Sequence, residues 1–244
     1  MPVFVCRDWS GLSSTSGPGA GSQPRPALAP LTFRAFPGEV IAVIGHNGAG
    51  KSTLFDLLAG LGHPSSGRVA TPVGSGKLTW CPQREIIDWL HTVRRNVLLG
   101  YRLRAPAHRA EREAEIQRVA SILGLTVFLD RTAETQSGGQ LRRTQIAGAM
   151  VGSPRLMLLD EPTTELDPEG IGVVFTELAR HAAAGGASLI STHETARFAD
   201  HCTRVLALGG GGVLCDEPID VFRARLPGAA DLWEIYQTLA GASA

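Results

Sequence analysis

Short apolar runs of strand length alternate along the chain with longer stretches in which apolar residues recur at helical spacing. The strand-length runs cover residues 40–45, 156–159 and 187–191. The stretches with helical spacing cover residues 51–61, 107–125 and 172–184. Continuous apolar strands that alternate with helices are typical of a parallel sheet covered on both faces. The pattern therefore predicts an α/β fold built on a parallel sheet.

Two further regions predict short strands outside that alternation. Residues 2–9 and 31–36 have the composition of strands, and the Gly-, Ser- and Pro-rich residues 11–26 between them predict a mobile loop. Residues 204–216 hold two apolar segments on either side of four glycines, which indicates a hairpin. We therefore expect additional strands near both ends of the chain.

Composition and charge argue against several kinds of partner. The 23 basic residues balance the 23 acidic ones, so no charge excess favours a nucleic-acid track or a membrane-surface anchor. The four cysteines have neither metal-ligand spacing nor the density of a disulfide framework, so we expect reduced cytosolic thiols. There is no leader and no uncharged apolar run of about 18 residues, so we expect no direct membrane insertion. A role at a membrane would then need a partner protein.

The segment GHNGAGKST, residues 45–53, lies between a predicted strand and a predicted helix, which is the context of a phosphate-binding loop (P-loop). Its glycines let successive backbone N–H groups and the helix N-terminus point at phosphate oxygens. Lys51 is expected to reach the β- and γ-phosphates, and Ser52 to ligate Mg²⁺. A glycine-rich turn before a helix is the simpler alternative, but the complete pattern favours the phosphate loop. The expected nucleotide ligands here are Gly45, Asn47, Gly48, Ala49, Gly50, Lys51, Ser52 and Thr53.

Two adjacent carboxylates follow the strand predicted at residues 156–159. Asp160 would lie at the C-terminal edge of a parallel sheet, where such sheets bind ligands, and could hold Mg²⁺ through water. Glu161 could polarise the water that attacks the γ-phosphate. Alone, the pair would be interpreted as an acidic turn before Pro162. Together with the phosphate loop, it predicts a site for a nucleoside triphosphate.

Three motifs then follow in order: QSGGQLRRTQ at 136–145, DEPTTELDP at 160–168 and STH at 191–193. With them the chain resembles the ATP-binding cassette (ABC) ATPases over nearly its whole length. The resemblance implies two ATP molecules at the interface of a head-to-tail dimer of cassettes. The signature motif, here Ser137, Gly138, Gly139 and Gln140, would cover the nucleotide bound by the P-loop of the partner cassette. Physically, a serine and glycines that open a helix form a second phosphate cradle.

The resemblance assigns three more residues. Gln83 is similar to the glutamine that touches Mg²⁺ or the attacking water, Asp167 to the aspartate that crosses the dimer interface, and His193 to the switch histidine at the γ-phosphate. Taken singly, these residues would be a polar residue after a strand, a helix cap before Pro168, and a loop histidine.

The chain departs from the family pattern in three places. Gln136 stands where a leucine is usual, and Glu165 where a glycine is frequent, which puts the dimer geometry in question. The aromatic residue that stacks on adenine would fall near Ser13, in a polar loop. Trp9 could replace it, or could be a core residue at a strand end.

The implied architecture is a P-loop NTPase core with an antiparallel β subdomain and an inserted helical subdomain. Residues 1–83 would form the first part of the nucleotide-binding core, with the β subdomain and the P-loop. Residues 84–153 would form the helical subdomain with the signature motif. Residues 154–244 would complete the core.

The stretch 84–105 resembles the same region of exporter-type cassettes that work with separate permease subunits. The apolar residues Ile86, Ile87, Trp89 and Leu90 would line a groove for a permease helix, or would pack within the helical subdomain. We therefore expect an ATPase that powers an exporter from the cytoplasmic face of the cell membrane. Its partners would be a permease and a second cassette, preferably an identical chain, and its cofactors ATP and Mg²⁺.

Other classes remain as alternatives. A soluble ABC ATPase of translation usually has two cassettes, and one of DNA repair has a long coiled coil; neither feature is visible. A nucleotide kinase has no use for QSGGQ and STH. A non-catalytic regulatory cassette would be expected to lose Glu161 or His193.

Overall fold

The computed structural model describes residues 4–10, 28–70, 77–102 and 109–242 of the chain. The predicted loop at 11–26, which includes Ser13, lies outside these ranges, whereas most of the predicted strand before it lies within them. Trp9 is part of that strand, and its side chain is not among those described.

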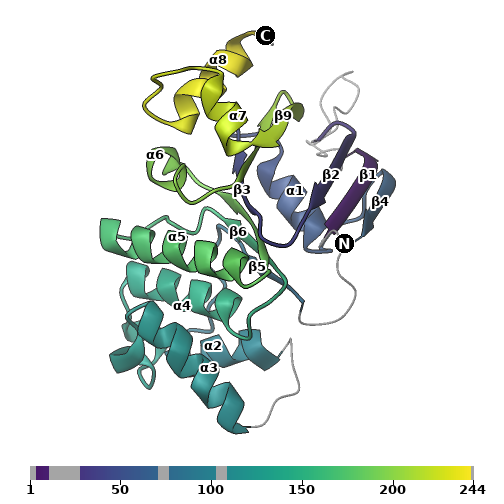
Figure 1. The fold of residues 1–244 in the computed structure, drawn as a ribbon. Helices are drawn as coiled ribbons and strands as arrows, with labels where there is room; N and C mark the ends of the chain where they lie inside the picture. The colour runs from purple at the N-terminus through teal and green to yellow at the C-terminus, as the bar shows by residue number, and fades with distance from the viewer. Residues whose placement is uncertain (1–3, 11–27, 71–76, 103–108, 243–244) are drawn as a thin grey trace, which may run out of the picture.

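A six-stranded sheet forms the centre of the molecule (Figure 1). Its strands, in spatial order, are β5 (Leu78–Cys81), β6 (Leu156–Asp160), β7 (Ala187–Ser191), β3 (Val40–Ile44), β8 (Arg204–Gly209) and β9 (Gly212–Pro218). All neighbouring pairs are parallel except β8 and β9, which form an antiparallel hairpin. The predicted parallel α/β core and the predicted hairpin are confirmed.

The side chains of β3 are all buried because both faces of this sheet are covered. Ile41 and Val43 belong to a core that includes α1 (Lys51–Leu58), whereas Val40, Ala42 and Ile44 belong to a second core formed mainly by the helices that follow residue 92. Alternate residues of a strand point to opposite faces, so one strand contributes to both cores. This explains why its sequence is a continuous apolar run.

A second, antiparallel sheet lies beside α1 (Figure 1). It contains β2 (Leu31–Ala35), β1 (Phe4–Ser10) and β4 (Ser66–Ala70), with β1 in the middle. In β2, buried and exposed residues alternate, and Leu31, Phe33 and Ala35 pack in the same core as α1. The small sheet therefore covers the P-loop helix from outside.

Three helices pack together at the other end of the molecule (Figure 1). They are α2 (Val93–Arg102), α3 (Arg109–Ile122) and α4 (Gly138–Met150). The 3₁₀ turns Thr126–Phe128 and Ala133–Thr135 connect α3 with α4. In α3, Ile116 and Val119 are buried and the charged residues face outward, as predicted from their spacing. Helix α2 was not predicted as a separate element.

The remaining helices are α5 (Pro168–Ala183), α6 (Thr195–Phe198), α7 (Ile219–Ala224) and α8 (Leu232–Ala242). Helix α5 lies beside α4, and α7 and α8 lie near the C-terminus at the top of Figure 1. In the part of the chain that the structure describes, no helix combines the length and the apolar character needed to cross a membrane.

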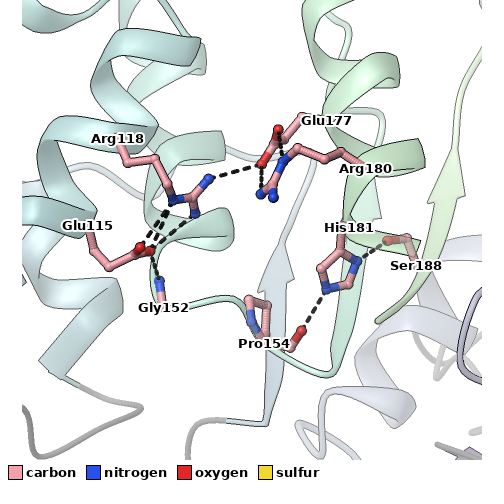
Figure 2. Close-up of polar contacts among 8 residues, drawn as sticks. All are labelled: Glu115, Arg118, Gly152, Pro154, Glu177, Arg180, His181 and Ser188. Carbon is pink, nitrogen blue, oxygen red and sulfur yellow. Dashed lines mark hydrogen bonds and ion pairs between the residues drawn. The ribbon is translucent and has the colours of Figure 1, made fainter. Parts of the chain in front are cut away.

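A polar network ties α3 to α5 (Figure 2). The guanidinium of Arg118 binds Glu115 within α3 and reaches Glu177 of α5 at 3.1 Å, and Arg180 binds the same Glu177 carboxylate. Burial acts to raise the pKa of Glu177, but the hydrogen bonds and charges of Arg180 and Arg118 outweigh it, so the pKa is lowered. A largely buried carboxylate thus stays ionised and joins two helices that belong to different parts of the sequence.

His181 anchors the C-terminal end of α5 to the large sheet (Figure 2). Its Nε2 lies 2.6 Å from the carbonyl oxygen of Pro154, and its Nδ1 lies 3.2 Å from the hydroxyl of Ser188 in β7. Burial lowers the pKa of His181, which favours the neutral ring. The imidazole lies against Gly186, where a Cβ atom would overlap the ring.

We predict that Gly186→Ala destabilises the protein by about 1–3 kcal/mol, the usual cost of an extra methyl group in a closely packed site. Urea-induced unfolding would measure the change. The matched control is Gly172→Ala in α5, where nothing lies within 4 Å of the added Cβ, so stability should hold or rise slightly. Equal stability of the two variants would contradict the described packing of His181.

Candidate functional site

The segment between β3 and α1 folds as a tight loop that is closed by a hydrogen bond within its own backbone. The N–H of Ala49 donates to the carbonyl of His46 at 3.1 Å, and Gly50 has a φ of 99° immediately before α1. A Cβ on Gly45 would lie 2.6 Å from the carbonyl oxygen of Leu208 in β8, so only glycine fits there. Residues 46–48 are exposed, so the outer side of the loop is open to a ligand.

Lys51 reaches back over this loop. Its Nζ donates to the carbonyl oxygens of Gly45 at 2.6 Å and His46 at 3.2 Å. Burial lowers the pKa of Lys51, and the negative charges of Glu161 and Asp160 act in the opposite direction. The ammonium group therefore lies within the field of both carboxylates, which places the loop and the acidic pair at one site.

Strand pairing explains why these segments meet. Val43 of β3 and Asp160 of β6 are both paired with Ser191, the last residue of β7. The Ser191 hydroxyl donates to Asp160 Oδ1 at 2.5 Å and accepts the N–H of Glu161 at 2.9 Å. Glu161 itself has a φ of 50°, an uncommon conformation for a residue with a side chain. One hydroxyl thus holds both carboxylate residues at the C-terminal edge of the sheet.

His193 contacts the second carboxylate. Its Nε2 lies 2.8 Å from Glu161 Oε1, and its side chain remains 57% exposed while that of Glu161 is 11% exposed. The Thr163 and Thr192 hydroxyls are 3.1 Å apart, which joins the same two segments a second time. The sequence singled out Glu161 and His193 separately, and the structure places them in direct contact.

The signature segment begins helix α4. Ser137 is its N-cap: the side chain of Ser137 accepts the N–H of Gln140 at 3.4 Å, and the side chain of Gln140 accepts the N–H of Ser137 at 3.0 Å. This reciprocal capping fixes the start of the helix. Gln136, which replaces the usual leucine, points its amide nitrogen at Thr132 and Thr135.

Glu165 packs against the two glycines of the signature segment. A Cβ on Gly138 would lie 2.5 Å from a carboxylate oxygen of Glu165, and one on Gly139 would lie 3.0 Å from its carbonyl oxygen. Glu165 has a φ of 68°, in the left-handed region that favours glycine. This geometry gives a physical reason for a glycine at position 165, and shows that the glutamate places a negative charge beside the start of α4.

Asp167 is the N-cap of α5. Its carboxylate accepts the N–H of Gly170 at 2.8 Å and pairs with Arg143 of α4 at 2.7 Å. The Gly170 N–H, together with Arg143, holds the pKa of Asp167 below its ordinary value. Asp167 is thus the helix cap given as the alternative interpretation, its predicted place at a dimer interface stays a prediction, and it also connects α5 to the helix of the signature segment.

The structure adds a residue that the sequence reasoning missed, Arg142. Its guanidinium is buried, with 6% exposure, and donates to five backbone carbonyls. The acceptors are Pro82 at 2.9 Å, Gln83 at 3.4 Å, Asp160 at 3.0 Å, Glu161 at 2.7 Å and Pro162 at 3.1 Å. Gln145, one turn later, donates to the carbonyls of Pro82 and Arg84. The only signal in the sequence was the position of an arginine on the inward face of α4.

The predicted site residues therefore form two groups. Residues 45–53, Asp160, Glu161 and His193 meet at the C-terminal edge of the sheet, where Ser52 lies in the first turn of α1. Residues 137–140 lie at the start of α4, and among the described residues no hydrogen bond or ion pair joins them to residues 45–53. The side chain of Gln83 is exposed beyond β5, and its carbonyl is held by Arg142.

The first group has the chemistry that a magnesium nucleotide needs. The hydroxyl of Ser52 and the carboxylate of Asp160 are hard oxygen donors of the kind Mg²⁺ prefers. Within the described ranges no group of three or more His, Cys, Asp or Glu could hold a metal by itself. Oxygen donors such as Ser52 and Asp160 fit Mg²⁺ that is also bound by phosphate oxygens and water.

We predict that Arg142→Met lowers the free energy of unfolding by at least about 3 kcal/mol, because several buried carbonyls lose their donor and each costs about 1–3 kcal/mol. Chemical denaturation would measure the loss. The neighbouring variant Arg143→Met removes an exposed ion pair with Asp167 and should cost much less. Similar losses in the two variants would show that the buried network contributes little.

Comparisons with known proteins agree with this geometry. A family model described as ABC transporter matches residues 28–164. The chain is 36% identical over 223 residues to the human retinal-specific phospholipid-transporting ATPase ABCA4, which covers 85% of this chain and 9% of that protein. The chain thus spans only about a tenth of the length of that relative.

Two further similarities cover most of this chain and most of the protein compared with it. The chain is 34% identical over 206 residues to the cobalt import ATP-binding protein CbiO of Rhodobacter capsulatus, covering 78% of this chain and 72% of that protein. A solved structure described as the ATP-binding subunit of an ABC transporter superposes with a TM-score of 0.85 at 26% identity, covering 97% of this chain and 99% of that one.

Proposed function

The chain belongs to the ABC transporter family, and on that premise we propose that it binds ATP with Mg²⁺ and hydrolyses it to drive a separate membrane permease. One observation carries the proposal: strand pairing through Ser191 brings the P-loop after β3 and the carboxylates at the end of β6 to one C-terminal edge of the sheet, where these carboxylates also act on the pKa of Lys51. This is the arrangement expected of a nucleoside triphosphatase. Family members named as transporting ATPases support it.

In this proposal Lys51 and the backbone N–H groups of residues 47–53 bind the phosphates. For Lys51, this means exchanging the carbonyls of Gly45 and His46 for phosphate oxygens. Ser52 and Asp160 would hold Mg²⁺, and Gln83 would contribute to its binding. When bound, Mg²⁺ neutralises charge on the phosphate oxygens.

Glu161 acts as the general base. Its carboxylate accepts the proton of the attacking water, and His193, 2.8 Å away, orients that carboxylate and reaches toward the γ-phosphate. The left-handed backbone of Glu161 and its N–H bond to Ser191 hold the carboxylate residue in place. A fixed base is useful only if the attacking water lies in line with the γ-phosphate. The P-loop and Lys51 would set the position of that phosphate.

We propose that the signature segment acts on a second cassette. Ser137 and Gly138 are exposed and have no contact with the P-loop of their own chain within the described residues. A dimer would let Ser137, Gly138, Gly139 and Gln140 close on the nucleotide bound by a partner, with Asp167 at the interface. An identical chain is the proposed partner. Glu165, beside Gly138, would then face that nucleotide.

The permease is proposed to dock in a groove between β5, α2 and α4. The groove has a volume of about 890 Å³, and Ile86, Ile87, Trp89 and Leu90 line it. Leu90 is 81% exposed, Ile86 51% and Trp89 46%. Packing within the chain therefore leaves much of these apolar side chains available for contact with another protein. A helix of a membrane subunit would cover them and would place this chain at the cytoplasmic face of the membrane.

The groove is connected to the catalytic edge, by which we mean the C-terminal edge of the large sheet with Lys51, Asp160, Glu161 and His193. Gln145 lines it and donates to the carbonyls of Pro82 and Arg84 on either side of Gln83. Arg142 continues the contact to the carbonyls of Asp160 and Glu161. A permease helix that moves residues 84–90 would therefore move the segment of Gln83 relative to the base.

The direction of transport stays a prediction. Residues 84–105 resemble exporter-type cassettes, whereas one relative is named an import protein. A soluble ABC ATPase is the alternative to a transporter subunit, and the exposed apolar groove favours a membrane partner over it. Isolation of the native complex from solubilised membranes separates the two.

We predict that Glu161→Gln lowers the ATP hydrolysis rate by roughly 10²- to 10⁴-fold, the usual contribution of a general base, while ATP binding survives. Because ATP favours the closed dimer, that dimer should accumulate by mass action. Sizing chromatography with ATP and Mg²⁺ would detect about twice the monomer mass. The control is the double variant with Lys51→Ala, which should bind no ATP and stay monomeric. A near wild-type rate in Glu161→Gln would remove Glu161 from the base role.

We predict that Leu90→Asp abolishes association with the permease but leaves ATP binding by the isolated chain unchanged, since it buries a charge in an apolar contact. Co-isolation from solubilised membranes would measure the association. Val127→Asp is the matched control, because Val127 is 74% exposed and lies outside the groove. If Leu90→Asp still associates as strongly as Val127→Asp, the permease docks elsewhere.

A further inference from the structure

Helix α8 brings two aromatic residues to the catalytic edge, although it lies near the end of the chain and far from every motif in sequence. We call Trp233 and Tyr236 the α8 aromatic pair. Their rings are stacked, with centroids 4.9 Å apart, and both contact the ring of His46 in the P-loop. Leu232 and Ile235 are buried, so the helix is fixed to the core at the same point.

Tyr236 is fully buried and holds the first residues of the loop. Its hydroxyl accepts the N–H of His46 at 3.1 Å and donates to the carbonyl of Leu208 at 3.0 Å. That carbonyl is also the group that closes off space beside Gly45. One phenol therefore satisfies a donor of the P-loop and an acceptor of β8, and sets the distance between them.

Trp233 contacts histidines from two separate motifs. Its ring lies edge-on to that of His46, with centroids 5.0 Å apart, and edge-on to that of His193, with centroids 6.4 Å apart. His193 also contacts Glu161, with its Nε2 2.8 Å from Glu161 Oε1. Since most of the His193 side chain is exposed, the indole and the carboxylate limit its orientation together.

We propose that the α8 aromatic pair are positioning residues of the ATPase site, with separate tasks: Tyr236 sets the P-loop for nucleotide binding, and Trp233 sets His193 for hydrolysis. The inference rests on the proposed function of the chain. Helix α8 would then position residues of the ATPase site in addition to packing against the core. Because the two residues lie one helical turn apart, a shift of α8 would act on binding and on chemistry at once.

The two tasks predict different kinetic effects. Tyr236→Phe keeps the ring but leaves the His46 N–H and the Leu208 carbonyl without this partner, so the Kd and KM for ATP should rise about 10-fold with kcat little changed. Trp233→Leu removes one support of His193, so kcat should fall about 10-fold with KM little changed. Both sizes are at the low end of the 10- to 100-fold losses seen when a supporting contact is removed.

The experiment measures kcat, KM and ATP affinity of the full chain with Mg²⁺, and the unfolding temperature of each variant. Trp233→Phe retains an aromatic ring and should recover most of the kcat lost in Trp233→Leu. Thr238→Ala, on the exposed side of α8, is the control and should match the wild type. Trp233 also provides a direct signal: ATP binding should change tryptophan fluorescence in the wild type, and this change should shrink in Trp233→Phe.

Separate effects on KM and kcat, with rescue by phenylalanine at 233, would support the inference. Unchanged kinetics in both variants would overturn it. Equal losses of kcat and affinity in both variants, in step with a lower unfolding temperature, would overturn it as well, because they would show general support of the fold. Tyr236→Phe is nearly isosteric, so the binding arm remains testable if Trp233→Leu folds poorly. A wild-type chain that binds no ATP would refute the proposed function instead.

Discussion

The buried guanidinium of Arg142 holds the parts of the catalytic edge in register. It donates to the carbonyl of the last residue of β6, to the two carbonyls after it, and to carbonyls that follow β5. A guanidinium has five donors in a rigid fork, and here backbone dipoles replace the carboxylate that usually pairs with a buried arginine. The charge is therefore solvated by the segments that carry Gln83, Asp160 and Glu161. Any displacement of one of these segments would cost part of that solvation.

Electrostatics at the edge of the sheet is organised around Lys51. Partial burial lowers the pKa of Lys51, and the negative charges of the two carboxylates beside it act in the opposite direction. The hydroxyl of Ser191, in the neighbouring strand, donates to the Asp160 carboxylate and accepts the backbone N–H of Glu161. Positive and negative groups thus approach one another without forming a closed ion pair. Such a site can exchange its internal contacts for those of a magnesium nucleotide.

Three surfaces converge on this edge from different directions. The apolar groove is lined by Gln145, which bonds to the segment of Gln83. The start of α4 packs against Glu165, which follows the acidic pair in the chain. Helix α8 touches His46 and His193 from the C-terminal part of the chain. In the proposed assembly, a permease helix, a second cassette and the α8 aromatic pair would influence the same few atoms. This arrangement suits an ATPase whose rate depends on its partners.

The sequence by itself determined the elements whose signals are local. The apolar runs of β3, β6 and β7, the loop at 45–53 and the cap at Asp167 follow from strand length, glycine spacing and capping chemistry, all within a few neighbouring residues. Tertiary structure alone decided which distant groups meet: Arg142 with the Pro82 carbonyl, Glu165 with Gly138, and Tyr236 with the N–H of His46, 190 residues away. Periodicity shows which face of an element is buried, whereas the partner of a buried polar group depends on how the sheets and helices pack.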